Sequence, residues 1–396
     1  MRARAPQMIV AISAVILLVG SSSWWILRPH PDLSGVDAMI VSGRYDAAEA
    51  RLRDYLRVYP GDEFARLMFA RMAVDRPEPD PALALEQIEG LHPLDIRRAA
   101  QIKAIEGDAH FWARRYDAAE PAWLEAIRLE PPIPEVGWKL LNIYALQGRD
   151  DDSGRLALRL FATEPDLHDR VQLLLQLLRH VAHPIEAGSI VHQLEPVVRD
   201  NPGDMHSALA LGAAMISSGR TEEGLGLLRG AVQSHGDDPD AWAAYLDGLV
   251  GTGGEEEVIR ALDRMPGDLA KLPRFDSARG WLHERRRDLD RAAQAYRRAL
   301  EARPSYAPLA YRLRGVLRQG GHIPDSDTLA PRLDAIARFP DRIRDYYDRL
   351  DALPDRGLKS GPELYREIAA MLRQVGRISE AEAWERLPRP EGVGSP

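Results

Sequence analysis

Small, aromatic and proline residues recur in this chain with a period of 34 residues. In the clearest copy, Gly107 is followed at increments of 9, 12, 16, 19 and 24 by Tyr116, Ala119, Trp123, Ala126 and Pro131. Pro165 stands 34 residues after Pro131, and Leu141, Tyr144, Gly148 and Phe161 fill the same phase. A fixed period of this length is typical of an array of helix-turn-helix units. The period therefore predicts an all-α solenoid, and alternation typical of strands is hard to find.

Each landmark has a physical reason. A small residue at Gly107 lets the first helix of a pair lie close to the second. Ala119 and Trp123, four residues apart, form a hole and a knob on one face of the second helix. Pro131 ends that helix, because proline has no N–H to continue the ladder. Together these residues resemble a tetratricopeptide repeat, which implies a right-handed solenoid whose concave face holds an extended peptide or a partner helix.

The landmarks place about nine to ten such repeats over residues 34–387, after a linker at 28–33. Repeat two is degenerate, because prolines within 76–81 interrupt it and begin a second helix over 82–89. Repeat five, about 168–202, is predicted to turn at His183 and Pro184. Repeat seven has a shortened second helix that ends at Pro266, and repeat nine is stretched between His322 and Pro340. The tail at 388–396 reads as disordered.

An uncharged stretch over residues 8–27 follows a basic segment at 1–7. Twenty residues just span a bilayer core of about 30 Å as a helix. Trp24 and Trp25 would lie at the far interface, and the basic residues that precede the span favour a cytoplasmic N-terminus. We therefore expect a single-pass anchor in the inner membrane, with most of the chain extracytoplasmic. A cleaved signal peptide remains open, because the strongly apolar part covers only residues 8–19 and Ser21 and Ser23 give a small-x-small pattern.

Composition narrows the function classes. The net charge of −8 argues against nucleic acid as a partner. The absence of cysteine excludes disulfides and thiolate metal sites. Acidic residues dominate 200–268 and arginines dominate 274–318, which indicates either solvated helix faces or attraction of an acidic partner.

No catalytic motif rises above background, so no catalytic, cofactor-binding or metal-binding residue is predicted. His180, His183 and His192 cluster in repeat five, but no carboxylate at i+4 completes a metal site. The acidic runs at 150–152 and 255–257 follow glycines and are predicted to be helix N-caps and first-turn acids.

The resemblance also suggests a groove, because the first helix of each tetratricopeptide repeat lines the concave face. Mapped onto repeats three to five, the groove positions are Phe111, Trp112, Trp138, Asn142, Gln172, Gln176, Arg179 and His180. In repeats eight and nine they are Trp281, Arg285, Tyr311 and Arg318. Aromatic and arginine side chains are the types that dominate binding energy at interfaces.

These observations favour a non-enzymatic protein–protein interaction scaffold, with a protein or peptide in the groove and the membrane as partner of the N-terminal helix. The alternative is an accessory, chaperone-like subunit of an envelope enzyme system, such as cytochrome maturation, polysaccharide export or secretion. An enzyme in its own right is the least favoured reading. The oligomeric state stays open.

Overall fold

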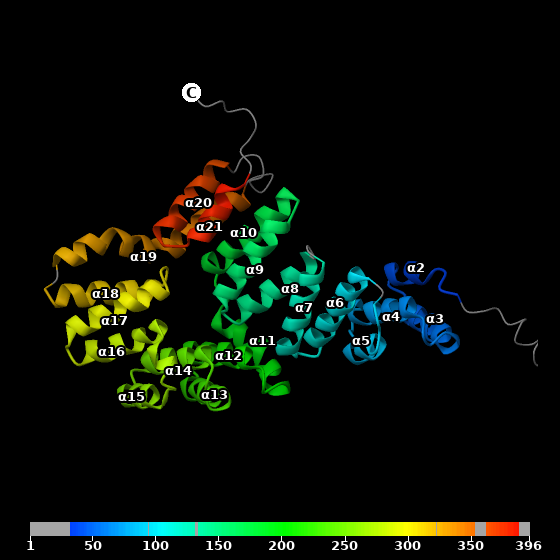
Figure 1. Ribbon diagram of the computed structural model, residues 1–396, viewed down its shortest axis with the longest axis horizontal. Helices are drawn as coiled ribbons and strands as arrows, with labels where there is room; N and C mark the ends of the chain where they lie inside the picture. Colours follow the sequence, from blue (N-terminus) through cyan, green and yellow to red (C-terminus); the bar gives the residue numbers. More distant parts are fainter. Residues whose placement is uncertain (1–31, 94, 131–133, 322, 353–361, 388–396) are drawn as a thin grey trace, which may run out of the picture. The chain divides into compact units, whose positions relative to one another are not determined.

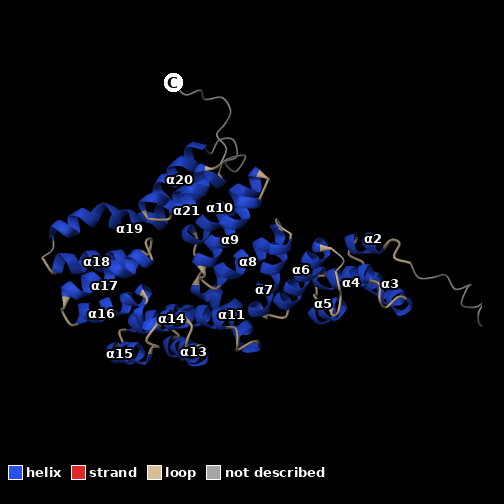
Figure 2. Cartoon of the chain, viewed as in Figure 1, coloured by secondary structure: helices blue, strands red, loops and turns tan. Residues whose placement is uncertain are grey.

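The computed structural model describes residues 32–93, 95–130, 134–321, 323–352 and 362–387, and those residues form helices and loops without a strand (Figure 2). The chain is divided into two compact units, the first ending at His92 and the second beginning at Pro93. The helical repeats expected from the 34-residue period are present in both.

The described residues of the first unit form the helices α2 (Val36–Val41), α3 (Tyr45–Val58), α4 (Glu63–Asp75) and α5 (Pro81–Ile88). Asp62 and Asp80 cap α4 and α5, since each side chain accepts a hydrogen bond from a backbone N–H three residues on. Pro81 occupies the first turn of α5, where its missing N–H costs nothing. The early end of the first helix of repeat two, predicted from its prolines, is confirmed.

Pairs of antiparallel helices make up most of the second unit. Its helices are α6 (Ile96–Trp112), α7 (Tyr116–Leu129), α8 (Pro134–Leu146), α9 (Asp150–Thr163), α10 (Leu167–Ala182), α11 (Ala187–Asp200), α12 (Met205–Ser217), α13 (Thr221–Ser234), α14 (Pro239–Thr252), α15 (Glu255–Arg264), α16 (Asp276–Arg285), α17 (Leu289–Ala302), α18 (Ala307–Gln319), α19 (Ile323–Asp351), α20 (Pro362–Gln374) and α21 (Ile378–Glu385), with short 3-10 turns η1 (Leu269–Lys271) and η2 (Pro273–Phe275). The shortened second helix of repeat seven, α15, is as predicted.

Close packing of first and second helices at glycine is confirmed. A Cβ added at Gly107 would lie 2.3 Å from Cδ1 of Trp123, so only glycine fits there without a shift of the ring. The same relation, with a spacing of sixteen residues, joins Gly280 to Tyr296 and Gly212 to Leu228. Ala119 and Trp123 are both fully buried. These contacts give the 34-residue landmarks the packing role inferred from the sequence.

The acidic runs at 150–152 and 255–257 were predicted to be both helix N-caps and first-turn acids, and only the second role is observed. Asp150, Asp151 and Asp152 occupy the first turn of α9, where they oppose the partial positive charge of the helix N-terminus. The N-cap itself is Arg149, and no side chain caps the helix there. The run at 255–257 likewise lies in the first turn of α15, after Gly254 as N-cap. The predicted N-cap role is therefore wrong for both runs, because the N-cap position falls one residue earlier.

Repeat five does not form the expected pair. The chain does turn after Ala182, but α10 packs on α9 and on α19, whereas α11 packs on α12 (Figure 1). The partner of α10 thus comes from a segment more than 140 residues later in the sequence.

Repeat nine also departs from prediction. Its stretched part is one continuous helix, α19, which runs through Pro331 and Pro340. Each proline removes one backbone hydrogen bond, and packing along α18, α10 and α20 stabilises the helix in spite of this loss. α19 thereby connects the two ends of a series of packed helices.

Through α19 the second unit closes on itself. Contacts run from α7 through α8, α9 and α10 to α19, then back through α18, α17, α16, α14 and α12 to α7. One apolar core contains residues of α6–α10 and of α17–α21, whereas the segment between them has smaller separate cores. The second unit is therefore a closed circuit of helices (Figure 1).

Among the described helices, none combines the length and apolar character required to cross a bilayer. The predicted span at 8–27, residues 28–31 of the predicted linker at 28–33, and the tail at 388–396 lie outside the described residues.

Candidate partner-binding surface

The helices α6, α8 and α10 are each the first helix of a repeat in the second unit. Polar contacts connect α6 to α8 and α8 to α10. On α6, Asp108 is almost fully buried, and its Oδ1 accepts hydrogen bonds from Trp123 Nε1 at 3.0 Å and from Lys139 Nζ at 2.6 Å. Lys139, on α8, keeps about a third of its side chain exposed. The buried carboxylate therefore fixes an ammonium group that still reaches solvent.

The next step joins α8 to α10. Gln176 Nε2 donates to Asn142 Oδ1 at 3.3 Å, across one repeat of 34 residues. Gln176 is buried, whereas Asn142 is exposed. Trp138, Lys139 and Asn142 lie within one turn of α8 and share a face. We call these three residues, with Gln176, the first-helix surface.

Two further predicted groove residues lie at the end of α6. Phe111 belongs to an aromatic cluster, since its ring centroid is 5.4 Å from that of Tyr116 and 5.7 Å from that of Trp123. Its role there is packing at the α6–α7 turn. Trp112 is 50% exposed and packs edge-on against Phe111 at 5.2 Å.

The predicted residues of α10 differ in accessibility. Arg179 is exposed, and Gln172 is partly buried with an Nε2 that has no hydrogen-bond partner among the described residues. The side chain of His180 lies outside the described part of the structure.

The four groove residues predicted in repeats eight and nine are divided between core and surface. Trp281 is only 5% exposed and belongs to an apolar core, so its indole is not offered to a partner. The Arg285 guanidinium lies 5.1 Å from the Trp281 ring and covers it. Tyr311 is 59% exposed, and Arg318 is exposed on the same helix.

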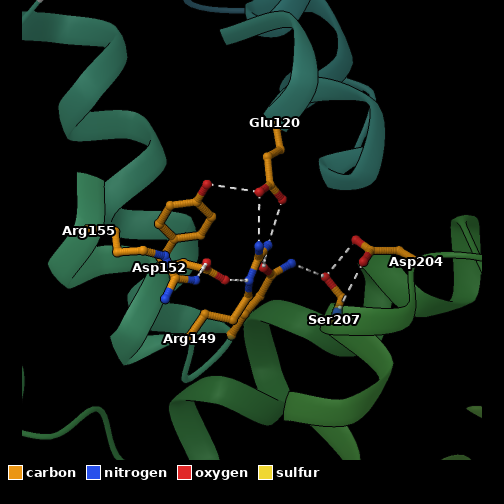
Figure 3. A network of polar contacts seen from close by, with 8 residues as sticks. Glu120, Arg149, Asp152, Arg155, Asp204 and Ser207 are labelled. Atoms are coloured by element: carbon orange, nitrogen blue, oxygen red, sulfur yellow. Dashed lines mark hydrogen bonds and ion pairs between the residues drawn. The ribbon is translucent and has the colours of Figure 1, made fainter. Parts of the chain in front are cut away.

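A second polar network connects α7, α8 and the N-terminus of α9 (Figure 3). Arg149 donates to both oxygens of Glu120, at 2.6 and 2.9 Å, and to Asp152 Oδ2 at 2.7 Å. Tyr144 Oη donates to Glu120 Oε1 at 2.8 Å, and burial raises the pKa of this phenol. Because both Arg149 and Glu120 are mostly buried, this bidentate pair fixes the relative positions of three helices.

The network in Figure 3 continues towards α12. Gln147 Nε2 donates to Ser207 Oγ at 3.0 Å, and Ser207 Oγ donates to Asp204 Oδ2 at 2.7 Å. Asp204 caps α12 by accepting from the Ser207 N–H at 3.1 Å. Burial raises the pKa of this carboxyl, which is only 1% exposed. These contacts reinforce the meeting of α12 with the α7–α9 region, which completes the circuit of helices.

Ion pairs at the surface join the acidic segment of the sequence to the basic one. Arg274 pairs with Asp240 at 2.7 Å, Arg285 with Glu255 at 3.2 Å, and Arg303 with Asp247 at 3.5 Å. Each pair joins the segment 200–268 to the segment 274–318. Part of the charge contrast is therefore taken up by ion pairs between neighbouring repeats, although exposed arginines such as Arg318 remain on α18.

Trp138, Asn142 and Gln176 of the first-helix surface are predicted groove positions, and this assignment stays a prediction, whereas Lys139 and Asp108 are not among the predicted positions. The signal for these two lies in tertiary structure, since Asp108 and Lys139 are 31 residues apart and meet only when α6 and α8 stack. The described part of the chain contains no cluster of three or more histidine and carboxylate side chains arranged to hold a metal.

Comparison with known proteins agrees with the repeat landmarks. Residues 273–317, which cover η2, α16, α17 and most of α18, match the tetratricopeptide repeat family. No curated protein matches the chain.

Among solved structures, the chain is similar to a chain of the APC/C hetero-tetramer Cut9–Hcn1, with 14% identity and a TM-score of 0.34 over 88% of this chain and 70% of that one. It is also similar to a Rap protein complexed with competence and sporulation factor, with 15% identity and a TM-score of 0.36 over 79% of this chain and 98% of that one.

Proposed function

We propose that this chain is a non-enzymatic interaction scaffold that binds an extended polypeptide segment at the first-helix surface. The observation that carries the proposal is the pair of contacts from Asp108 to Lys139 and from Gln176 to Asn142. Each holds an accessible polar side chain in place through a buried neighbour. A partner would therefore lose little binding energy in ordering this surface.

The chemistry of the surface suggests its ligand. Asn142 can both donate to and accept from a peptide backbone. Lys139 offers further N–H donors beside it. Trp138 packs partly against the apolar core, and the part of its indole that stays exposed adds apolar contact area on the same turn. An extended chain that carries an acidic or carbonyl-rich segment fits this combination.

We further propose that residues 8–27 anchor the chain in the inner membrane, with the helical array on the extracytoplasmic side. The uncharged run, the flanking arginines and the tryptophan pair support this location. Export after cleavage of the same segment is the alternative. Mass spectrometry of the mature N-terminus distinguishes them, because cleavage removes the run and an anchor retains it.

The second candidate function is that of an accessory subunit in an envelope enzyme system. Co-purification from membranes tests it, since an accessory subunit would be recovered with one defined enzyme at constant stoichiometry.

Site-specific photo-crosslinking tests the binding surface. A photoreactive amino acid at Trp138 should capture a defined polypeptide segment, whereas the same group at Arg128, an exposed residue of the second helix α7, should not. The Lys139→Ala and Asn142→Ala double variant should weaken capture at position 138 at least tenfold. Equal capture at both positions, or capture unaffected by the double variant, would refute the assignment.

A further inference from the structure

Two turns between paired helices have an arginine in the left-handed backbone conformation. Arg114 follows α6 and Arg287 follows α16, with φ angles of 58° and 61°. After other first helices the same conformation is taken by glycine, at Gly43, Gly148, Gly219, Gly253, Gly321 and Gly376. This conformation is less favourable for a residue with a Cβ than for glycine. An arginine in such a turn therefore points to a contact that its side chain makes.

The two arginines occupy equivalent positions. Each stands seven residues after the closely packed glycine of its repeat, which is Gly107 for Arg114 and Gly280 for Arg287. Each backbone N–H donates to the carbonyl oxygen three residues earlier, at 2.9 Å for Arg114 and at 3.0 Å for Arg287. Because the turns have the same backbone hydrogen bond, the two sites differ in what their side chains contact.

The side chain of Arg114 has a carboxylate within the chain. Its Nη1 donates to Oδ2 of Asp200 at 2.6 Å, although Asp200 ends α11 and lies 86 residues away in sequence. The ion pair joins the α6–α7 turn to α11. This contact accounts for an arginine in the first of the two turns, because glycine could not make it.

Arg287 forms no ion pair with another described residue. Its Nη1 donates to Oε1 of Gln319, a neutral acceptor at the end of α18, at 3.4 Å. The two arginines before it share one carboxylate, since Arg285 and Arg286 lie 3.2 and 3.5 Å from the two oxygens of Glu255. All three consecutive arginines are exposed. The second turn therefore has the strained arginine but lacks the carboxylate that accompanies the first.

Neighbouring carboxylates do not supply the missing charge. Asp288, the next residue, caps α17 by accepting from the N–H of Arg291 and pairs with the Arg291 guanidinium, at 3.3 Å in each case. Arg318, which precedes Gln319, is also exposed and has no ion pair within the described part of the chain. Exposed positive charge is thus in excess where α16 and α18 end, although the chain as a whole carries a net charge of −8.

We propose that the arginines at 285–287 and Arg318 form a docking surface for an acidic segment of a partner protein, in which a carboxylate binds Arg287 as Asp200 binds Arg114. The charge of the surface selects the partner, and the planar guanidinium groups suit carboxylates. This inference goes beyond the scaffold function proposed above, because it adds a second contact region with a different chemistry. It does not depend on the first-helix surface.

A peptide of alternating glutamate and serine tests this surface, and the same peptide with glutamine in place of glutamate is its control. We expect the full chain to bind the glutamate peptide about fivefold more tightly than the glutamine peptide at low salt. Arg287→Gly should weaken binding about threefold, and Arg287→Gly with Arg318→Ala about tenfold. Arg159→Ala, which changes an exposed arginine of α9, should bind as the wild type does. Equal binding of the two peptides, or undiminished binding by the double variant, would overturn the proposal.

Hydrogen exchange locates the bound peptide, because Lys139 of the first-helix surface can attract the same charge. Slower exchange in the α16–α17 turn and at the end of α18 would support the proposal. Slower exchange confined to α8 and α10 would overturn it. Binding of phosphatidylglycerol vesicles that requires Arg287 and Arg318, without binding of the glutamate peptide, would overturn it in favour of a membrane surface.

The stability of two glycine variants provides a separate check. Arg114→Gly should lower the midpoint of urea unfolding, because it removes the ion pair with Asp200. Arg287→Gly should leave the midpoint unchanged or raise it, because glycine relieves the backbone strain and no internal ion pair is lost. An equal loss of stability in both variants would show that Arg287 serves the fold, and would overturn the proposal.

Discussion

Adding one methyl group at Gly107 should destabilise the protein, although alanine is the better helix former. The new Cβ would lie 2.3 Å from Cδ1 and 2.5 Å from Nε1 of Trp123. The indole cannot move away easily, because it is fully buried and its Nε1 donates to Asp108 at 3.0 Å.

The expected magnitude follows from three contributions. Replacing glycine by alanine inside a helix gains about 1 kcal/mol. Overpacking of a filled core costs about 1–3 kcal/mol. If the ring shifts enough to lose its hydrogen bond to the Asp108 carboxylate, a further ~1.5–3 kcal/mol is lost. The Gly107→Ala variant should therefore be less stable by about 0–2 kcal/mol if the hydrogen bond survives, and by about 1.5–5 kcal/mol if it is lost.

Gly315 provides the matched control, since it lies inside α18 and a Cβ there would meet nothing within 4 Å. Gly315→Ala should stabilise the chain by about 0.5–1 kcal/mol. Urea unfolding followed by circular dichroism compares the two variants, and Trp123→Leu in the Gly107→Ala background should recover part of the loss. If Gly107→Ala were as stabilising as Gly315→Ala, the close approach of α6 and α7 would be refuted.

Three further predictions concern the polar contacts. Lys139→Ala should lower the free energy of unfolding by about 1–3 kcal/mol, because it removes the ammonium partner of the buried Asp108 carboxylate. Urea unfolding measures this, and an unchanged midpoint would contradict the pairing of Lys139 with Asp108. Burial raises the pKa of Asp204 in the folded state, so the stability due to its neutral form is present at acid pH and lost as pH rises through the folded pKa. Asp204→Asn keeps the cap and should gain stability relative to wild type as pH rises from 4 to 7, whereas parallel pH profiles would argue against a buried charge. Raising salt from about 0.05 to 1 M should speed hydrogen exchange in α15 and α16 more than in α6 and α7. The reason is that salt screens exposed ion pairs such as Arg285 with Glu255, which join α16 to α15. Equal effects on both pairs of helices would refute the role of these ion pairs.

Much of the array was readable from local sequence. Gly107 predicted a close helix contact because it stands sixteen residues before Trp123 in the repeat, and the structure confirms that contact and shows the same one at Gly212 and Gly280. The prolines at 76–81 and Pro266 predicted helix ends because proline acts on its own turn. Such residues act within one or two turns of the helix, so their effects can be predicted without knowledge of the tertiary fold.

The closure of the second unit could not be read in this way. Arg344 and Ala182 meet across 162 residues, and nothing in the 34-residue period distinguishes α19 from α11 as the partner of α10. The same limit applies to the candidate surface. Trp281 occupies a groove position by sequence, but neighbouring helices bury it, while Lys139 gains its place only from Asp108 on another helix.

The most direct test of the scaffold account is hydrogen exchange of the full chain with and without the polypeptide captured at position 138. The account predicts slower exchange in α8 and α10 on binding, with the second helices α13 and α15 unchanged. Slower exchange confined to α13 and α15, or no change in any helix, would contradict the claim that the first-helix surface binds a partner.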